Sequence, residues 1–459
     1  HDGPFYNNAF LDLVVDNLGL TMIRNNFYPD FEPQNENGDP HSLDMQAFNY
    51  SGKFMTRQRD WLIALKNKAA ASGEPMRFTA AYWTPPAWMK TNGDEIGGSL
   101  REDMYDKFAE YAVATVRAYK QQCDIDLYAL SLENEPRTVH PWESCVYTAT
   151  EYRDLVALAG PRLHAESADL KLFGAEDGLR FFGTFEGALM ADTLTRRQMH
   201  ALAVHDYYGG DHPTPTAEAK SMYRRAAGLC AGVGKPLWMT ETSGYDDSWD
   251  DCMLLAENML VGLKYGKLSA WMWWQLGNEG PASVYELTNR GVPTRRLYIV
   301  KHFSRYIRPG AVGIDCESSD TLVAAVAFHH PDRHTLTVVL VNTAGSAITV
   351  DVSAQGLTEV TAYRSTADRD CADIGTVQAA SVRLPARSVT TLVAADWTPS
   401  TATLPMIGAA PRPALSSAST RAYDLRGRHA SRNGHGAHPA AGLTVIAGPR
   451  GVRPRLLLR

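Results

Sequence analysis

Short apolar segments alternate with longer amphipathic segments from the start of the chain to about residue 296. The short segments are apolar on both faces, as strands buried in a parallel sheet are. The longer ones repeat apolar residues at the three- and four-residue spacing of a helix. This alternation predicts β–α units that build a parallel sheet. Seven strands are expected, at 20–25, 76–83, 127–135, 170–174, 201–208, 236–242 and 269–275.

A closed (β/α)8 barrel needs eight such strands, so the chain is one strand short. The segment 8–18 has a helical pattern with no strand-like segment before it. We therefore expect the fold class to be α/β, with a (β/α)8 TIM barrel over 1–296 whose first strand lies upstream of His1. Such a sheet would expose two unpaired edges.

The pattern changes near residue 297 to short β-rich runs separated by turns. This predicts a small antiparallel β-sandwich over 297–396. Residues 397–420 are rich in Pro, Ala, Ser and Thr, which indicates a linker, and 421–459 form a separate tail. The predicted strands of the sandwich are 322–328, 335–342, 347–352, 359–364 and 388–394.

Charge is distributed unevenly between the body of the chain and its tail. From Pro411 onward there are nine Arg, no Lys and one Asp, whereas the formal charge of the whole chain is −6. A mild negative charge argues against nucleic acid as the main partner. The sequence contains no run of 18 apolar residues, so no transmembrane segment is predicted. No signal peptide is visible at His1-Asp2-Gly3, and the absence of an initiator Met suggests a processed or truncated start.

The six cysteines lie far apart and include no CxxC pair. This spacing argues against zinc and redox motifs. We expect buried thiols for most of them, and one or two disulfides if the protein is exported. No cofactor and no metal site are predicted, although the acidic body leaves a cation-binding domain as a weaker alternative.

Two of the predicted strands end in a carboxylate, one at Asn134-Glu135-Pro136 and the other at Thr240-Glu241. Functional side chains of parallel barrels collect at the carboxyl ends of the strands. A single Glu at such a place is usually solvated or ion-paired, but two at matched positions favour glycosidic bond cleavage. Strand alternation predicts that Ser131, Glu133 and Glu135 share one face.

The roles of the two carboxylates follow from this chemistry. We predict that Glu135 is protonated and serves as acid/base, while Glu241 is ionised and serves as nucleophile. A retaining reaction needs the carboxyl groups about 5–5.5 Å apart, and an inverting one roughly 6.5–9.5 Å.

Several motifs resemble those of glycoside hydrolase family 30. Segments 131–136 and 238–241 are similar to its acid/base and nucleophile motifs, and 82–92, Tyr-Trp-Thr-Pro-Pro-Ala-Trp-Met-Lys-Thr-Asn, to its signature after the third strand. Arg24 before Asp30-Phe31, His205-Asp206-Tyr207 and Trp274-Gln275 also fit the family pattern. The resemblance covers roughly residues 10–395.

The resemblance implies a retaining glycosidase in which Arg24 and Tyr207 orient Glu241 by hydrogen bonds. It also implies a sugar site, whose expected lining is Asp30, Trp83, Asn134, His205 and Trp274. Alternatives remain for some of these residues. The two tryptophans could fill the core, Arg24 could close a structural ion pair, and His205 could be a satisfied strand-end histidine.

The expected function is hydrolysis of β-glycosidic bonds in a polysaccharide, with xylan, β-1,6-glucan and β-1,6-galactan all compatible. The stretch 276–281 has no Arg and contains Glu279, so a strict preference for glucuronic acid side chains is not expected. A glucosylceramidase-like β-glucosidase and a non-catalytic carbohydrate-binding protein are the alternatives.

Segments 421–428 and 442–446 resemble the C-terminal sorting domain of the Bacteroidetes-type secretion pathway. This predicts a secreted or cell-surface protein, expected to be a monomer. A basic tail that binds polyanions is the competing interpretation.

Overall fold

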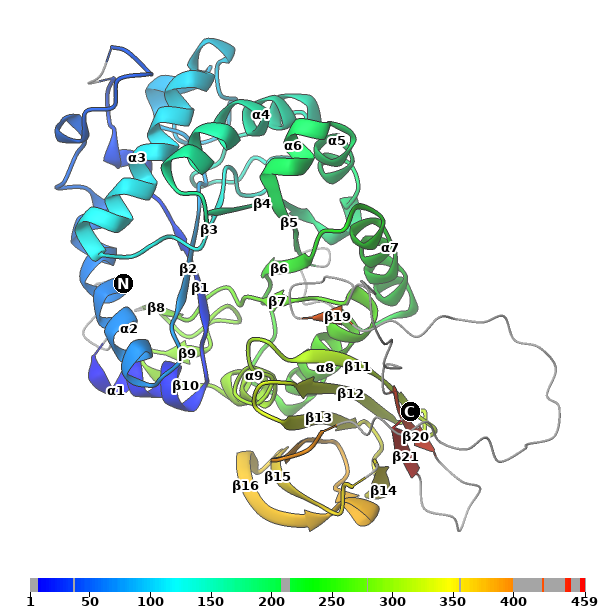
Figure 1. Ribbon diagram of the computed structural model, residues 1–459. Helices are drawn as coiled ribbons and strands as arrows, with labels where there is room; N and C mark the ends of the chain where they lie inside the picture. The colour runs from blue at the N-terminus through cyan, green and yellow to red at the C-terminus, as the bar shows by residue number, and fades with distance from the viewer. Residues whose placement is uncertain are drawn as a thin grey trace.

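The computed structural model describes residues 7–35, 38–207, 215–278, 280–354 and 356–398, together with three short C-terminal strands. It has two parts (Figure 1). One is a curled parallel sheet surrounded by helices, and the other is an antiparallel β-sandwich. Both predicted architectures are confirmed. No helix of the described part is long and apolar enough to cross a bilayer.

The parallel sheet contains the seven predicted strands, which pair side by side in chain order. Among the described residues no pairing joins the first strand to the seventh, so the sheet curls without closing. The strands are β1 (Met22–Asn26), β2 (Arg77–Ala81), β3 (Ala129–Ser131), β4 (Lys171–Gly178), β5 (Met199–His205), β6 (Leu237–Glu241) and β7 (Ala270–Trp271).

Helices cover the outer face of this sheet (Figure 1). Local signals set their ends: α4 begins with a capping box between Thr148 and Glu151, and α7 ends at Gly234, which has φ of +68°. The helices are α1 (Asn8–Leu11), α2 (Arg59–Ala71), α3 (Tyr105–Cys123), α4 (Ala149–Glu166), α5 (Phe185–Ala191), α6 (Thr193–Gln198), α7 (Ala217–Val233), α8 (Trp249–Val261) and α9 (Arg295–Ser304).

The main hydrophobic core lies between the sheet and its helices. Phe27, Leu62, Phe108, Leu130 and Leu172 are among its fully buried members. All six cysteines are buried free thiols, as expected for most of them. Three short strands, β8 (Gly277–Asn278), β9 (Thr288–Asn289) and β10 (Val292–Pro293), lead from the sheet to α9.

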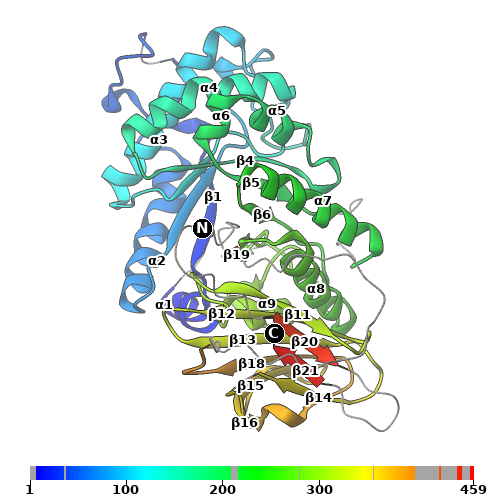
Figure 2. The ribbon, with the colours of Figure 1, turned by 45° about the vertical axis from the view of Figure 1, so that its right-hand side comes forward.

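The sandwich contains the five predicted strands and three further ones. Its strands are β11 (Val312–Ser318), β12 (Val323–His330), β13 (Thr335–Asn342), β14 (Ile348–Ser353), β15 (Glu359–Thr366), β16 (Arg369–Gln378), β17 (Val382–Leu384) and β18 (Ser388–Ala394). It packs against α8 and α9, which lie between it and the parallel sheet (Figure 2). A separate apolar cluster, with Met259, Phe303, Val339 and Val389 among its members, forms this junction.

The tail contributes β19 (Tyr423–Asp424), β20 (Gly442–Ile446) and β21 (Arg455–Leu458). β20 pairs in parallel with β11 and antiparallel with β21. The predicted linker beyond Thr398 and most of the predicted sorting segment lie outside the described residues.

Candidate active site

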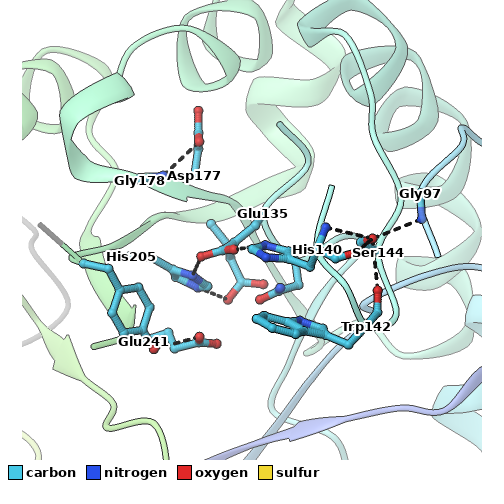
Figure 3. Close-up of polar contacts among 12 residues, drawn as sticks. Gly97, Glu135, His140, Trp142, Ser144, Asp177, Gly178, His205 and Glu241 are labelled. Atoms are coloured by element: carbon cyan, nitrogen blue, oxygen red, sulfur yellow. Dashed lines mark hydrogen bonds and ion pairs between the residues drawn. The ribbon is translucent and has the colours of Figure 1, made fainter. Parts of the chain in front are cut away.

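Polar side chains from several strands converge at the carboxyl ends of the parallel sheet. They come from β1, β4, β5, β6 and the segments that follow β3 and β5. Figure 3 shows Glu135, His205 and Glu241 of this group. The members are Arg24, Asn134, Glu135, Glu176, His205, Tyr207 and Glu241, with Glu176 lying within β4 near its end.

The structure brings the two predicted carboxylates together. One carboxylate oxygen of Glu135, one of Glu241 and a ring nitrogen of His205 all lie within 4.8 Å of one another. The Glu135 side chain is 17% exposed and that of Glu241 10% exposed, so both are largely removed from water. Two carboxyl groups that are this close together and this buried cannot both be ionised unless nearby positive charges compensate them.

Glu135 is placed by loop geometry rather than by strand alternation. β3 ends at Ser131, the Asn134 N–H donates to the carbonyl of Tyr82 at 2.7 Å, and Glu135 has φ of +50°. Glu133 is fully buried and in the field of Lys90, and burial raises its pKa well above the usual range. Strand alternation, on which the predicted common face of Ser131, Glu133 and Glu135 rested, therefore stops at Ser131.

Arg24 and Tyr207 hold Glu241 from two directions. The Arg24 Nη1 donates to Oε2 of Glu241 at 3.0 Å, and the Tyr207 hydroxyl donates to Oε1 at 2.8 Å. The remaining nitrogens of the Arg24 fork contact Asn134 Oδ1 at 2.7 Å and Glu176 Oε1 at 2.8 Å. Arg24 is therefore part of an ion-pair network and an orienting group for Glu241 at the same time.

Two histidines hold Glu135. The Nδ1 of His205 lies 2.8 Å from Oε1, and the Nε2 of His140 contacts Oε2. The other ring nitrogen of His205 lies 3.6 Å from Oε1 of Glu176. The contacts thus run without interruption from Glu135 through His205, Glu176 and Arg24 to Glu241.

This network sets the protonation of the pair in the free protein. Burial alone would raise the pKa of Glu135, but its contacts with His140 and His205 lower it below the usual range. Burial raises the pKa of Glu241 against the charges of His205 and Arg24. Both shifts run opposite to the predicted order, in which Glu135 is protonated and Glu241 is ionised.

The charged neighbours respond to the same field. Burial would lower the pKa of His205, but the nearby carboxylates raise it to about 10. Burial would raise the pKa of Glu176, but Arg24 and His205 lower it to about 2. The charge of Arg24 and the raised pKa of His205 therefore offset the negative charges of the surrounding carboxylates.

The predicted aromatic residues lie beside this cluster. The rings of Trp83 and Trp274 have centroids 5.6 Å apart, and the Arg24 guanidinium lies 4.5 Å from the centre of the Trp83 ring. Trp83 is 5% exposed and Trp274 is partly exposed. Trp83 thus packs under Arg24, whereas Trp274 keeps part of its surface free.

Asp30 does not join the cluster in the described contacts. Its Oδ2 accepts the N–H of Lys53 at 2.9 Å, and its carbonyl accepts the amide of Asn49 at 2.9 Å. It therefore organises the loop after β1. The sugar-lining role that the family resemblance implies for Asp30 stays a prediction.

Sequence reasoning missed Glu176 and His140. Glu176 lies near the end of β4, has φ of +61° and is completely buried, so the strand-end argument used for Glu135 and Glu241 could have found it. His140 lies in an irregular loop, where no periodic signal predicts the direction of a side chain.

The Glu135, His205 and Glu241 ligand atoms are also close enough together to hold a metal ion. The Arg24 guanidinium already places a permanent positive charge 3.0 Å from Glu241. A second cation would meet repulsion there. The arrangement is better suited to moving a proton between acidic groups and to nucleophilic attack by a carboxylate.

Comparison with known proteins places this geometry in a family. Residues 24–294 match the glycosyl hydrolase family 30 TIM-barrel domain, and 310–392 match the family's beta sandwich domain. The chain is 26% identical over 297 residues to glucuronoxylanase XynC of Bacillus subtilis, covering 62% of this chain and 64% of that protein. It is 27% identical over 299 residues to lysosomal acid glucosylceramidase of Mus musculus, covering 59% and 57%.

The matches thus span about three fifths of the length of these curated relatives. Among solved structures, a GH30 endoxylanase from Clostridium papyrosolvens C71 shares the fold with a TM-score of 0.69 at 22% identity, covering 85% of this chain and 93% of that one. The two matched domains, in this order along the chain and with paired carboxylates at the sheet's carboxyl edge, show that the chain belongs to glycosyl hydrolase family 30.

Proposed function

We propose that this glycosidase cleaves β-glycosidic bonds of a polysaccharide with retention of configuration. The observation that carries the proposal is the separation of at most 4.8 Å between one oxygen of Glu135 and one of Glu241. Carboxyl groups of retaining enzymes lie about 5–5.5 Å apart, whereas inverting enzymes need roughly 6.5–9.5 Å to admit a water. The short separation supports direct attack by a carboxylate.

In the proposed reaction Glu241, ionised, attacks the anomeric carbon while Glu135 gives its proton to the departing glycosidic oxygen. The bond to that oxygen breaks and a glycosyl ester on Glu241 forms. Water then attacks the anomeric carbon, gives its proton to Glu135 and releases Glu241, which restores the starting state. Arg24 and Tyr207 hold the attacking carboxylate in one orientation through their contacts at 3.0 and 2.8 Å.

The reactive protonation state requires the proton of the pair to be on Glu135. In the free protein two histidines contact Glu135 and favour its ionised form. We propose that a bound sugar displaces the contact with His140, because the leaving oxygen needs access to the acid. Loss of that contact raises the proton affinity of Glu135 and shifts the shared proton toward it.

A carbohydrate polymer is the proposed substrate because aromatic surface borders the carboxylate pair. The partly exposed Trp274 suits the apolar C–H face of a sugar ring. Relatives named for glucuronoxylan and for glucosylceramide both share the domain. Residues 276–281 include no Arg that could bind a uronate. We therefore propose that the substrate is xylan, cleaved without a strict requirement for glucuronic acid side chains, or a β-1,6-linked glycan.

The test compares Glu241→Ala and Glu135→Ala with the wild type on aryl β-glycosides, xylan, β-1,6-glucan and a glucosylceramide. Loss of the nucleophile should reduce turnover on the order of 10⁴-fold or more. Loss of the acid/base should cost roughly 10²–10⁴-fold on substrates with poor leaving groups. Glu218→Ala, which removes an exposed glutamate of α7, is the matched control.

Azide distinguishes the two roles. It should restore activity to Glu241→Ala with an α-glycosyl azide as product, and to Glu135→Ala with a β-glycosyl azide. Unchanged rates in Glu241→Ala would refute the role of Glu241 as nucleophile. If glucosylceramide is the best substrate, the proposal of a polysaccharide substrate is replaced by a glucosylceramidase-like one.

We also propose that the protein acts outside the cytoplasm, on the strength of the sorting-type sequence in its tail and the polymeric substrate. Fractionation of cells that produce the full chain tests this. Activity confined to the cytoplasmic fraction would refute export.

A further inference from the structure

The loop between β3 and α4, residues 132–148, carries Glu135 and presents an aromatic pair next to it. The rings of His140 and Trp142 are stacked, with centroids 4.7 Å apart and planes inclined by 9°. His140 also contacts Oε2 of Glu135, so Trp142 is one ring removed from that carboxylate. Trp142 is 51% exposed, which is unusual for an indole beside a buried polar cluster.

Buried polar contacts hold this loop in one shape. The Ser144 hydroxyl accepts the N–H of Gly97 at 3.1 Å and the N–H of His140 at 3.2 Å. The Lys90 ammonium, on a residue only 3% exposed, donates to the carbonyl of Ser144 at 2.7 Å. These contacts hold the backbone that carries His140 and Trp142 in place before any substrate binds.

The position of the pair identifies which part of a substrate it would meet. Oε1 of Glu135 faces His205, whereas Oε2 faces His140. Figure 3 shows His140 and Trp142 on the side of Glu135 opposite His205. The sugar that reacts with Glu241 lies on the nucleophile's side, and the group beyond the glycosidic oxygen lies past Glu135.

We propose that Trp142 is the floor of the leaving-group subsite and stacks on the sugar ring that departs. This assignment rests on the proposed hydrolase function. The flat indole matches the C–H face of a pyranose, and the nearby ion pair of Lys53 and Glu143, 3.6 Å apart, supplies groups that can bond to its hydroxyls. Trp142 thereby selects substrates with a ring on the leaving side.

The test uses substrates with the same glycone and different leaving groups. β-Xylobiosyl fluoride is compared with xylotetraose, and β-gentiobiosyl fluoride with gentiotetraose, using the pair that the wild type hydrolyses. Fluoride offers no ring to stack on the indole. Trp142→Ala should lower kcat/KM roughly tenfold more on the tetrasaccharide than on the fluoride, and Trp142→Phe should restore most of the loss.

Phe181→Ala is the control, because Phe181 is also 51% exposed but contacts Arg137 instead of the catalytic cluster. Equal losses on the two substrates in Trp142→Ala would overturn the subsite. A selective loss on octyl β-glucoside instead would also overturn it and indicate an alkyl-binding surface. If the wild type hydrolyses no substrate of either pair, the proposed function fails and the subsite with it.

Discussion

Removal of Arg24 gives the sharpest test of how the cluster is held together. Arg24→Ala takes away a guanidinium whose side chain is 4% exposed and that contacts Glu176 and Glu241. Both carboxylates stay buried, and breaking such a pair costs about 3–5 kcal/mol. The pKa of Glu176, lowered from 4.5 to about 2, is equivalent to about 3 kcal/mol of stabilising interaction, which agrees with that range.

The same substitution has a defined effect on pH dependence. A carboxylate with a lowered pKa stabilises the fold above its unfolded value and loses that contribution as pH falls through its folded value. The wild type should therefore lose stability between about pH 4.5 and 2, and Arg24→Ala should lose much less over this window. The guanidinium lowers the pKa of Glu241, so its loss should move the acid limb of kcat/KM to higher pH.

Urea unfolding at several pH values, together with pH–rate profiles, provides the measurement. Arg117→Ala is the control because Arg117 pairs with Glu166 at 2.8 Å with 38% and 21% of the side chains exposed, and it should cost no more than about 1 kcal/mol. Arg24→Lys should recover the charge without the full set of contacts. If Arg24→Ala proves as mild as Arg117→Ala and its acid limb does not move, the reasoning about a buried charge network is refuted.

Three further predictions concern stability. The pKa of His205 is raised from 6.5 to about 10. The protonated ring therefore contributes fully to folding stability below pH 6.5, and this contribution is lost as pH rises through 10. Urea unfolding midpoints of the wild type should fall over this window more than those of His205→Gln. Gly19 has φ of +76°, and an added Cβ would lie 2.8 Å from the Cα of Arg305. Gly19→Ala should therefore lower the Tm measured by calorimetry. Gly228 lies on α7 with open space around an added Cβ, so Gly228→Ala should maintain or raise the Tm. Burial raises the pKa of Glu133 well above its usual range, which favours the uncharged form. Glu133→Gln should therefore change the unfolding free energy by less than about 1 kcal/mol; a loss of several kcal/mol would show that the ionised form is the native one.

The parallel sheet could be predicted because its strands are buried on both faces. β6 is buried at every position, so its apolar run stands out in the sequence. In the sandwich, β12 and β13 carry the same signal. β16 escaped prediction because half of its residues are polar and exposed, so neither a continuous apolar run nor a clean alternation marks it.

Members of the site could be predicted where the side chain belongs to a strand or lies within a few residues of the end of one. Arg24 and Glu241 lie on β1 and β6, and the structure brings them into contact. Glu135 itself has a left-handed backbone conformation, and His140 lies in an irregular loop. A sequence pattern alone therefore does not predict which residues their side chains contact. The order of proton affinities depends on distances of a few ångströms between side chains far apart in the sequence, which no local pattern encodes.

The uninterrupted line of contacts from Glu135 to Glu241 has a consequence for any titration of this enzyme. Groups that interact this strongly release their protons in macroscopic steps that belong to the assembly and not to single residues. A substitution at Glu176, which we place outside the bond-breaking step, should therefore displace both limbs of the activity profile. Chemical shifts of the individual side chains, followed separately, would each report a curve with more than one inflection.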